Sequence, residues 1–298
     1  MKLCKPLFEI WEQSAGLEGV YKQIERVGRV CYKSEDKITE DSAKPFVDRM
    51  VKSGHGAMLE HGTVYLKITY KYTDFNTLCM FYGKNKYSVL NHSEDNKIYY
   101  ITTNYRVLVE NNHLSDLKYL CEPTEFHERR ITVHFVCDRG VSHEFVRHRV
   151  MSFAQESTRY CNYSKDKFGN ELTFIKPCWL DIPTGQYVYW DGDWCDINKT
   201  KIQLPEGEHK DIDAFLWTLN NAETHYTLLI NSGWKPQEAR AILPNSLKTE
   251  LVVTGFTSDW EKFFDLRTRG TTGAPHPQAK ELAEPLMKEF IARKYIDN

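Results

Sequence analysis

The sequence has no long apolar run and no targeting segment, which argues against several classes of membrane and secreted protein. No apolar stretch approaches the roughly 18 residues that a membrane-spanning helix needs. Residues 1–6 likewise lack the apolar run of a signal peptide. We therefore expect a soluble, cytoplasmic protein with no membrane partner.

Cysteine pairs and metal-ligand spacings are also missing. The eight cysteines are scattered along 298 residues, and no C-x-x-C occurs among them. Because disulfide frameworks belong to short secreted chains and zinc ribbons to paired spacings, we expect neither, only reduced thiols. His143 and His148 are one residue too far apart for H-E-x-x-H, so on a helix their imidazoles would diverge. No metal site is predicted.

Charge of neither sign is in excess. The 39 Lys and Arg residues nearly balance 41 Asp and Glu residues, which gives a formal net charge of −2. A nucleic-acid partner is therefore not predicted, and any anion site must be a local cluster of basic side chains. Hydrophobic residues make up 41% and charged residues 27%, an ordinary balance for one large domain or two small ones.

What the sequence does contain is a set of helical patterns. Apolar residues at helical spacing predict helices over five segments: 17–32, 42–52, 141–151, 213–231 and 276–292. Pro236 should open a further short helix that ends near Pro244, and Pro285 should kink the last helix. Ser258 and Glu261 form a capping box, which predicts that another helix begins at Ser258.

Strand patterns are fewer than helical ones. Alternating β-branched residues predict strands over 63–69 and 131–136, with a short third strand at 251–253. Segments 71–130 and 161–210 show weak periodicity, and the second is rich in loop-forming residues; loops this long are uncommon unless functional or inserted. The predicted fold class is α+β, with mixed helices and a small, largely antiparallel sheet.

The densest set of functional side chains follows residue 143. In a helix over 141–151, Glu144, Arg147 and His148 would lie on one face. Arginine offers a planar fork of donors that suits phosphate, and its charge is permanent. The simpler alternative is a solvated basic helix surface, which short charged runs usually form.

The residues after this segment could add to the same site. An extended chain over 154–160 would turn Gln155, Ser157 and Arg159 to one side. Together with the preceding helix, this arrangement would bring guanidinium, hydroxyl and amide groups onto one ligand.

The run Arg147-His148-Arg149, followed after seven residues by Ser157, resembles the R-H-R-x7-S signature of the flavin-dependent thymidylate synthases. Segment 157–160 resembles the family's S-x-R-Y, and further matches occur in family order. These are 29–32, His55 with 59–61, 238–244, 263–267 and 276–278. The resemblance implies a single catalytic domain over 1–298. Segments 71–130 and 166–212 have no counterpart and are interpreted as insertions.

The resemblance implies an enzyme that methylates dUMP to dTMP. Methylenetetrahydrofolate would supply the carbon, and FAD with NADPH would supply the reducing equivalents. No G-x-G-x-x-G follows a strand, so the flavin dinucleotide is not expected on a Rossmann turn. The family is homotetrameric with active sites shared between subunits, which implies the same assembly here.

The resemblance also implies site residues. Those for dUMP are Glu144, Arg147, Gln155, Ser157, Thr158, Arg159, Arg240 and Arg267. Those for the cofactors are His55, Arg147, His148, Arg149, Gln155, Ser258 and Lys262. The catalytic pair would be Arg267, at the uracil edge, and Ser157, close to the pyrimidine. Because arginine is a poor proton acceptor, Arg267 would stabilise charge on the uracil rather than act as a base.

Two alternatives stay open. A non-catalytic relative could bind nucleotide or flavin, because Phe256, Ser258 and Lys262 stand where the family often has asparagine and arginine. A nucleic-acid-binding module could instead place several arginines on one face, although the near-neutral net charge argues against it. Those arginines are Arg139, Arg147, Arg149 and Arg159.

Overall fold

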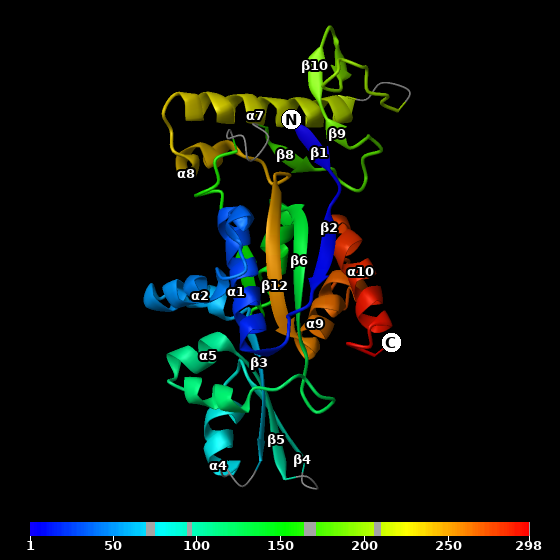
Figure 1. Cartoon of the computed structure of the whole chain (residues 1–298). Coiled ribbons are helices and arrows are strands. Elements are labelled where there is room, and N and C mark those ends of the chain that lie inside the picture. Colours follow the sequence, from blue (N-terminus) through cyan, green and yellow to red (C-terminus); the bar gives the residue numbers. More distant parts are fainter. Residues whose placement is uncertain (70–74, 94–96, 164–170, 206–209, 298) are drawn as a thin grey trace.

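The computed structural model describes residues 1–69, 75–93, 97–163, 171–205 and 210–297. Helices surround several small, mostly antiparallel sheets, as Figure 1 shows, so the predicted α+β class is confirmed. Three long helices agree closely with predicted ones: α1 (Gly16–Tyr32), α7 (Lys210–Asn231) and α10 (Pro277–Ala292). In this described part of the chain, no helix is both long and apolar enough to cross a membrane.

A four-stranded antiparallel sheet forms the centre of the molecule. Its order is β2 (Leu7–Trp11), β6 (Arg130–Asp138), β12 (Lys248–Phe256) and β7 (Ser152–Gln155). Strands β6 and β12 pair along their full lengths, from Asp138 opposite Lys248 to Arg130 opposite Phe256. The strands predicted over 131–136 and 251–253 are therefore confirmed, and both are longer than predicted.

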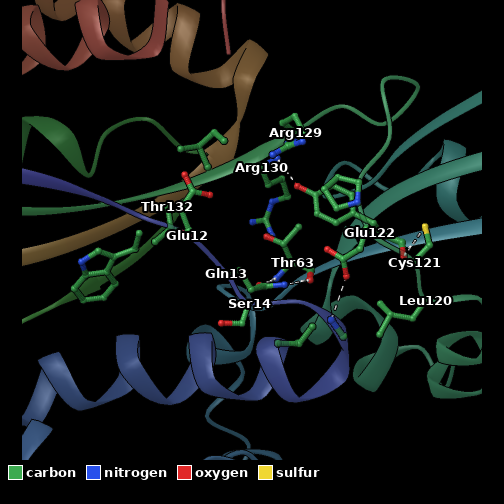
Figure 2. Close-up of a pocket in the computed structure, with 16 residues that line it drawn as sticks. Glu12, Gln13, Ser14, Thr63, Leu120, Cys121, Glu122, Arg129, Arg130 and Thr132 are labelled. Carbon is green, nitrogen blue, oxygen red and sulfur yellow. Dashed lines mark hydrogen bonds between the residues drawn. The ribbon is translucent and has the colours of Figure 1, made fainter. Parts of the chain in front are cut away.

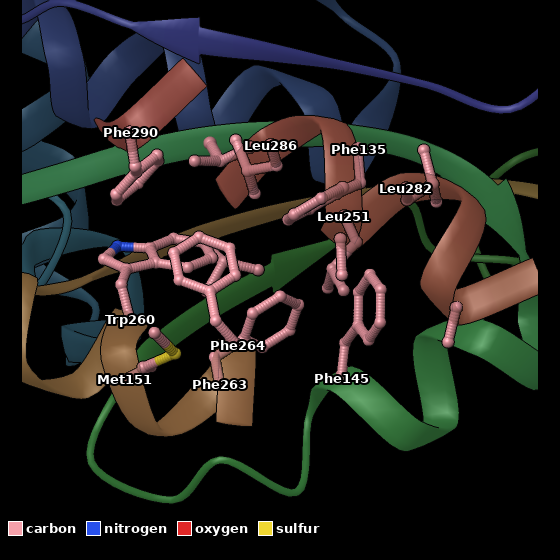
Figure 3. Close-up of a cluster of buried hydrophobic side chains, with 14 of the residues drawn as sticks. Phe135, Phe145, Met151, Leu251, Trp260, Phe263, Phe264, Leu282, Leu286 and Phe290 are labelled. Carbon is pink, nitrogen blue, oxygen red and sulfur yellow. The ribbon is translucent and has the colours of Figure 1, made fainter. Parts of the chain in front are cut away.

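One face of this sheet carries an apolar core, to which β6 contributes Phe135 and β12 contributes Leu251. The helices that cover it are α6 (Arg139–Phe145), α9 (Thr257–Phe264) and α10. Figure 3 shows aromatic rings from α9 and α10 packed together over the strands. The rings of Phe264 and Phe290 meet edge to face with 5.2 Å between centroids, a favourable geometry for aromatic pairs.

Helix α1 covers the opposite face of the sheet. Val27 and Val30 of α1 pack on Val252 of β12. Alternate strand residues on this face include buried polar groups, among them Thr254, whose Oγ1 lies 2.8 Å from Nδ1 of His61. Burial lowers the pKa of His61 to about 3, so its imidazole is neutral.

A second antiparallel sheet of three strands, in the order β3 (Thr63–Thr69), β5 (Ile98–Asn104) and β4 (Val89–Ser93), has its own apolar core. Strand β3 has the bounds that its alternating sequence predicts. The 3-10 turn Glu35–Lys37 follows α1. The helical segments that contribute to the core of this sheet are α2 (Ala43–Lys52), α3 (Gly56–Leu59), α4 (Phe75–Leu78), the π-helical turn Cys79–Gly83, α5 (Tyr105–Glu110) and the 3-10 turn Leu114–Tyr119. Much of segment 71–130 is thus regular structure, while its residues 71–74 and 94–96 lie outside the described residues.

A third set of strands lies beside α7 at the N-terminal end of the chain (Figure 1). Strand β1 (Lys2–Cys4) pairs in parallel with β8 (Thr173–Ile175) and antiparallel with β9 (Gly185–Gln186). A hairpin follows, made of β10 (Val188–Trp190) and β11 (Asp193–Cys195). The prediction of loop over 161–210 is therefore wrong for these strands, and residues 164–170 and 206–209 lie outside the described chain.

Helix α6 ends at Phe145, so the prediction of a helix over 141–151 is wrong beyond that residue. Residues 146–151 turn, with the amide of His148 bonded to the carbonyl of Phe145 at 3.3 Å, and the chain enters β7 at Ser152. A longer helix would carry the chain away from the edge of β12, with which β7 pairs.

Strand β7 ends at Gln155, so the extended conformation considered for 154–160 holds for residues 154–155 but does not continue as a strand. The chain turns instead, and the amide of Cys161 bonds to the carbonyl of Ser157 at 2.9 Å. The amide of Ser157 bonds to the carbonyl of Cys31 in α1 at 3.0 Å. A tertiary contact with α1 thus replaces the strand ladder at this point.

Ser258 does not form the predicted capping box. Helix α9 begins at Thr257, and Oγ of Ser258 donates to Oε1 of Glu128 at 2.5 Å. The N-cap position is held by Phe256, so Ser258 lies inside the first turn of the helix and is not placed to cap it. Helix α10 is continuous across Pro285.

The central core predicts a large difference between two identical substitutions. Leu286→Ala, at a fully buried site on α10, should lower the free energy of unfolding by about 2–5 kcal/mol. Leu7→Ala, at a site 51% exposed, is the matched control and should cost less than about 0.5 kcal/mol. Equal denaturant midpoints for the two variants would contradict this assignment of the core.

Candidate active site

Arg267 is the centre of one group of predicted site residues. It lies on the π-helical turn Asp265–Arg269, which continues α9. Its Nη1 donates to Oε2 of Glu144 at 2.5 Å, and its Nη2 donates to the Glu144 carbonyl at 2.8 Å. Its Nε donates to Nε2 of His148 at 3.3 Å. We call Glu144, His148 and Arg267 the Arg267 cluster.

His148 in this cluster is neutral. Burial, and then the nearby charge of Arg267, lower the pKa of His148 to about 4. Because its Nε2 accepts a hydrogen bond from Arg267, the imidazole proton lies on Nδ1. His148 therefore orients the guanidinium without neutralising it.

Arg267 keeps donors for a ligand. An arginine has five N–H donors, and three are used here, so one remains on each terminal nitrogen. Burial lowers the pKa of Arg267, Glu144 opposes that shift, and the guanidinium stays cationic at neutral pH. The neighbouring Arg147 and Arg149 are exposed, and no described residue pairs with either side chain.

A second group, which we call the Ser157 cluster, comprises Ser157, Thr158, Arg159 and Arg240. Arg240 begins the 3-10 turn Arg240–Ile242 after α8 (Pro236–Ala239), and its Nη1 donates to Oγ1 of Thr158 at 3.3 Å. Oγ of Ser157 accepts a hydrogen bond from the amide of Arg159 at 3.3 Å. Both arginines are exposed, and no carboxylate of the described residues forms an ion pair with either.

An open cavity of about 690 Å³ lies beside the Ser157 cluster. Its lining is basic and includes Arg29, Lys33, Lys37, Arg49 and His55. Tyr32 also lines it, and the ring of Tyr32 lies 5.3 Å from that of Tyr160, next to Arg159. This volume is typical of sites for small organic molecules. His55 is the only predicted site residue here. Arg29 and Tyr32 lie in the segment 29–32 that resembles the family, whereas Lys33, Lys37 and Arg49 carry no local signal beyond their charge.

Three predicted cofactor residues lie elsewhere. Nε2 of Gln155 donates to Oγ of Ser142 at 2.8 Å. Ser258 bonds to Glu128, and Nζ of Lys262 lies 3.5 Å from Asp259. Across the described ranges, no side-chain hydrogen bond or ion pair joins these three residues to either cluster, or joins one cluster to the other.

The chain matches the sequence profile of the family described as thymidylate synthase complementing protein over residues 70–293. This match covers 224 of the 298 residues and includes both arginine clusters. The chain belongs to this family. His55 and the basic cavity beside it lie before the first residue of the match.

Individual proteins with similar sequences carry names from the same family. The flavin-dependent thymidylate synthase of Pyrococcus furiosus is 30% identical over 163 residues, which are 54% of this chain and 53% of that protein. The flavin-dependent thymidylate synthase of Corynebacterium aurimucosum is 22% identical over 281 residues, 93% of this chain and 78% of that protein. The chain spans about half the length of the first of these relatives.

A solved structure was also found, of the UMP/dUMP methylase PolB from Streptomyces cacaoi bound with 5-Br UMP. It has a TM-score of 0.45 and 15% sequence identity to this chain, and the superposition covers 98% of this chain and 92% of that one.

The Arg267 cluster predicts a specific titration behaviour for His148. Its folded pKa lies below the ordinary value near 6.5, so its contribution to stability is full above pH ~6.5 and is lost as pH falls toward 4. Arg267→Gln removes a repelling charge and should raise the pKa of His148, which nevertheless stays below 6.5 because burial remains. Histidine proton NMR measures this shift.

Arg269→Gln is the matched control for this titration. Arg269 lies on the same π-helical turn, and its Nη1 is bonded to Asp265 at 2.8 Å rather than to His148. The pKa of His148 should not change in this variant. A His148 that titrates near 6.5 in the unmodified protein would contradict the described cluster.

Proposed function

We propose that this chain is a cytoplasmic flavin-dependent thymidylate synthase that converts dUMP to dTMP. Methylenetetrahydrofolate would give its one-carbon unit to C5 of the uracil, and two electrons from NADPH, carried by FAD, would reduce that carbon to a methyl group. Tetrahydrofolate and NADP⁺ would be the other products. The observation that carries this proposal is the pair of exposed arginines, Arg159 and Arg240, beside the Ser157 hydroxyl: each bonds a neutral side chain, Gln237 and Thr158 respectively, and neither forms an ion pair with a described carboxylate.

The Ser157 cluster suits a nucleotide phosphate. Arg159 and Arg240 bring two permanent charges, and neither is neutralised by a carboxylate of the described chain. Thr158 holds one terminal nitrogen of Arg240, which leaves the rest of that guanidinium to donate to phosphate oxygens. Ser157 accepts a bond from a backbone amide, so its own O–H can donate to the pyrimidine.

Arg267 suits the uracil edge. Its two free N–H donors lie on the terminal nitrogens, in the planar geometry that a carbonyl and an ionised ring nitrogen would accept. Charge that develops on the uracil when C5 attacks would be stabilised by this cation, which acts without moving a proton. Glu144 and His148 hold the guanidinium in place beforehand, so little reorganisation is needed.

The donor set fits part of a flavin dinucleotide. Its pyrophosphate needs several donors, and Arg147 and Arg149 are exposed and unpartnered within the described chain. His55 and the basic cavity would hold another anionic or planar part of a cofactor. When bound, the flavin supplies the reducing equivalents. Ser258 and Lys262 do not join this set and are left out of the proposed flavin site.

A homotetramer with shared active sites would account for two clusters that no hydrogen bond or ion pair of the described residues joins. We propose that the Arg267 cluster of one subunit completes the Ser157 cluster of another, within one catalytic domain that carries the segments 71–130 and 166–212 as insertions. An apolar groove of about 420 Å³, lined in part by Leu228 and Ile242, lies next to Arg240. Leu228 is 59% exposed and Ile242 40% exposed, which suits burial against a second subunit.

A non-catalytic nucleotide-binding relative is the second candidate function. The observation that favours it is the engagement of Ser258 and Lys262 with acidic neighbours instead of with the arginine clusters. Such a protein would bind dUMP through the Ser157 cluster and form no dTMP.

An anaerobic assay for dTMP with FAD, NADPH, dUMP and methylenetetrahydrofolate tests the proposed function. Arg159→Gln removes a charged phosphate contact and should raise the KM for dUMP by about 10–100-fold. Arg267→Gln should chiefly lower kcat, because the lost interaction strengthens in the transition state. Arg269→Gln, on the same turn as Arg267, should retain activity. Turnover by Arg267→Gln at the unmodified rate would refute the role given to this arginine.

Subunit mixing tests the shared site. At a dUMP concentration near the KM of the unmodified protein, Arg267→Gln and Arg240→Gln are each expected to have little activity alone. Mixed and reassembled in equal amounts, they should regain roughly a quarter of the normal activity, because that fraction of two-chain sites takes both intact clusters. If mixed tetramers form and their activity does not exceed that of either variant alone, both clusters belong to a site within one chain.

A further inference from the structure

A small cavity of about 160 Å³ lies apart from both arginine clusters. Figure 2 shows it between the start of α1, strand β3 and strand β6, where the central sheet meets the three-stranded sheet. Two consecutive arginines, Arg129 and Arg130, line it. Neither has a role in the proposed reaction.

Arg130 is a buried cation without a counter-ion. Arg130 is 8% exposed, and its Nη1 donates to the carbonyl of Glu60 at 3.0 Å. The other acceptors are hydroxyls: Oγ1 of Thr63 at 3.4 Å and Oγ of Ser152 at 3.3 Å. Its Nε is buried with no hydrogen-bond partner, and no described carboxylate lies within 4.0 Å of the guanidinium.

Burying the Arg130 guanidinium without a counter-ion lowers the stability of the folded chain. Neutral acceptors satisfy some of the N–H groups, but they supply no opposite charge to offset the desolvation of a guanidinium. Burial lowers the pKa of Arg130 to about 10, with Glu60 and Asp259 opposing the shift only in part. An anion beside Arg130 would remove most of this penalty.

Arg129 adds a second charge to the cavity. It is half-buried, and no described residue accepts a hydrogen bond from its side chain. Two carboxylates also line the cavity and already accept hydrogen bonds: Oε1 of Glu12 accepts from Arg293 at 3.0 Å, and Oε1 of Glu122 accepts from the amide of Gly16, another lining residue, at 3.3 Å. Both glutamates are exposed, whereas Arg130 is buried.

The volume limits what can bind. About 160 Å³ is well below the roughly 300–1,000 Å³ of typical sites for small organic molecules. A tetrahedral oxyanion or a small carboxylate fits in this space, and a nucleotide or a flavin does not. We propose that this cavity is a binding site for a small oxyanion such as inorganic phosphate, held by Arg129 and Arg130.

A bound oxyanion would act on the fold around the active site. Arg130 already ties Glu60 and Thr63, at the start of the three-stranded sheet, to Ser152 at the start of β7. Strand β7 leads directly into the Ser157 cluster. Binding therefore stabilises the folded chain and steadies the strand that positions that cluster.

Phosphate titration of the full-length chain tests this site. The parent for the titration is the double variant Arg159→Gln with Arg240→Gln, which removes the phosphate contacts proposed for dUMP, so the result does not depend on the proposed function. Calorimetry at constant ionic strength, balanced with chloride, should show saturable phosphate binding, of which one site per chain is lost with Arg129→Gln. Phosphate should also raise the melting temperature.

Variants of the cavity locate the binding. Arg129→Gln, added to this parent, should weaken phosphate binding about tenfold or more and should fold normally, because Arg129 has no described partner. Lys288→Gln, at a side chain 72% exposed on α10, is the matched control and should bind phosphate like the parent. Parallel titrations with sulfate and with acetate show whether the site binds tetrahedral oxyanions or carboxylates.

Two results would overturn the proposal. One is the absence of saturable binding by any of the three anions, which would leave water as the partner of Arg130 Nε. The other is binding, or a rise in melting temperature, that is the same with Arg129→Gln as without it. Arg130→Lys gives a second check, since it keeps the charge but loses the planar fork and should also weaken binding.

Discussion

The antiparallel ladder between β6 and β12 is the constraint on which the site depends. Helix α6, which carries Glu144, leaves the Asp138 end of β6, and the 3-10 turn that carries Arg240 precedes the Lys248 end of β12. Strand β7 pairs with β12 and delivers the chain to Ser157. The register of these strands therefore decides where each arginine lies, and a slip of one residue would exchange the two faces of the sheet.

A buried ionic network beneath the Ser157 cluster holds this end of the ladder. Nζ of Lys248 lies 3.0 Å from Glu156 and 2.6 Å from Glu250, and Tyr163 donates to Glu156 at 2.8 Å. Burial acts to raise the pKa of Glu250, but the hydrogen bond from His134 and the charge of Lys248 keep that pKa far below its ordinary value. Each buried charge here has a partner, so the network orients the turn without leaving an unsatisfied ion.

Sequence patterns predicted the elements whose signals are local. The amphipathic repeat of α1 and the alternation of β3 sufficed because each element buries one face against a continuous core. Strand β8 gave no such signal, since three residues are too short for a pattern and its parallel partner β1 lies about 170 positions away. Helix α6 ended early for a tertiary reason, the need of β7 to reach β12.

In the candidate site too, local sequence patterns predicted some residues, whereas contacts between distant segments were not predictable. The R-H-R run located Arg147 and Arg149, but no pattern could show that Gln155 would bond to Ser142 within the chain. Pairing also distinguishes an arginine that a carboxylate orients from arginines whose charge no carboxylate offsets. Arg267 is oriented by Glu144, whereas Arg159 and Arg240 have no carboxylate in the described chain. With a net charge of −2, such unpaired cations are a local arrangement rather than a general excess, and a polyanionic ligand is what would balance them.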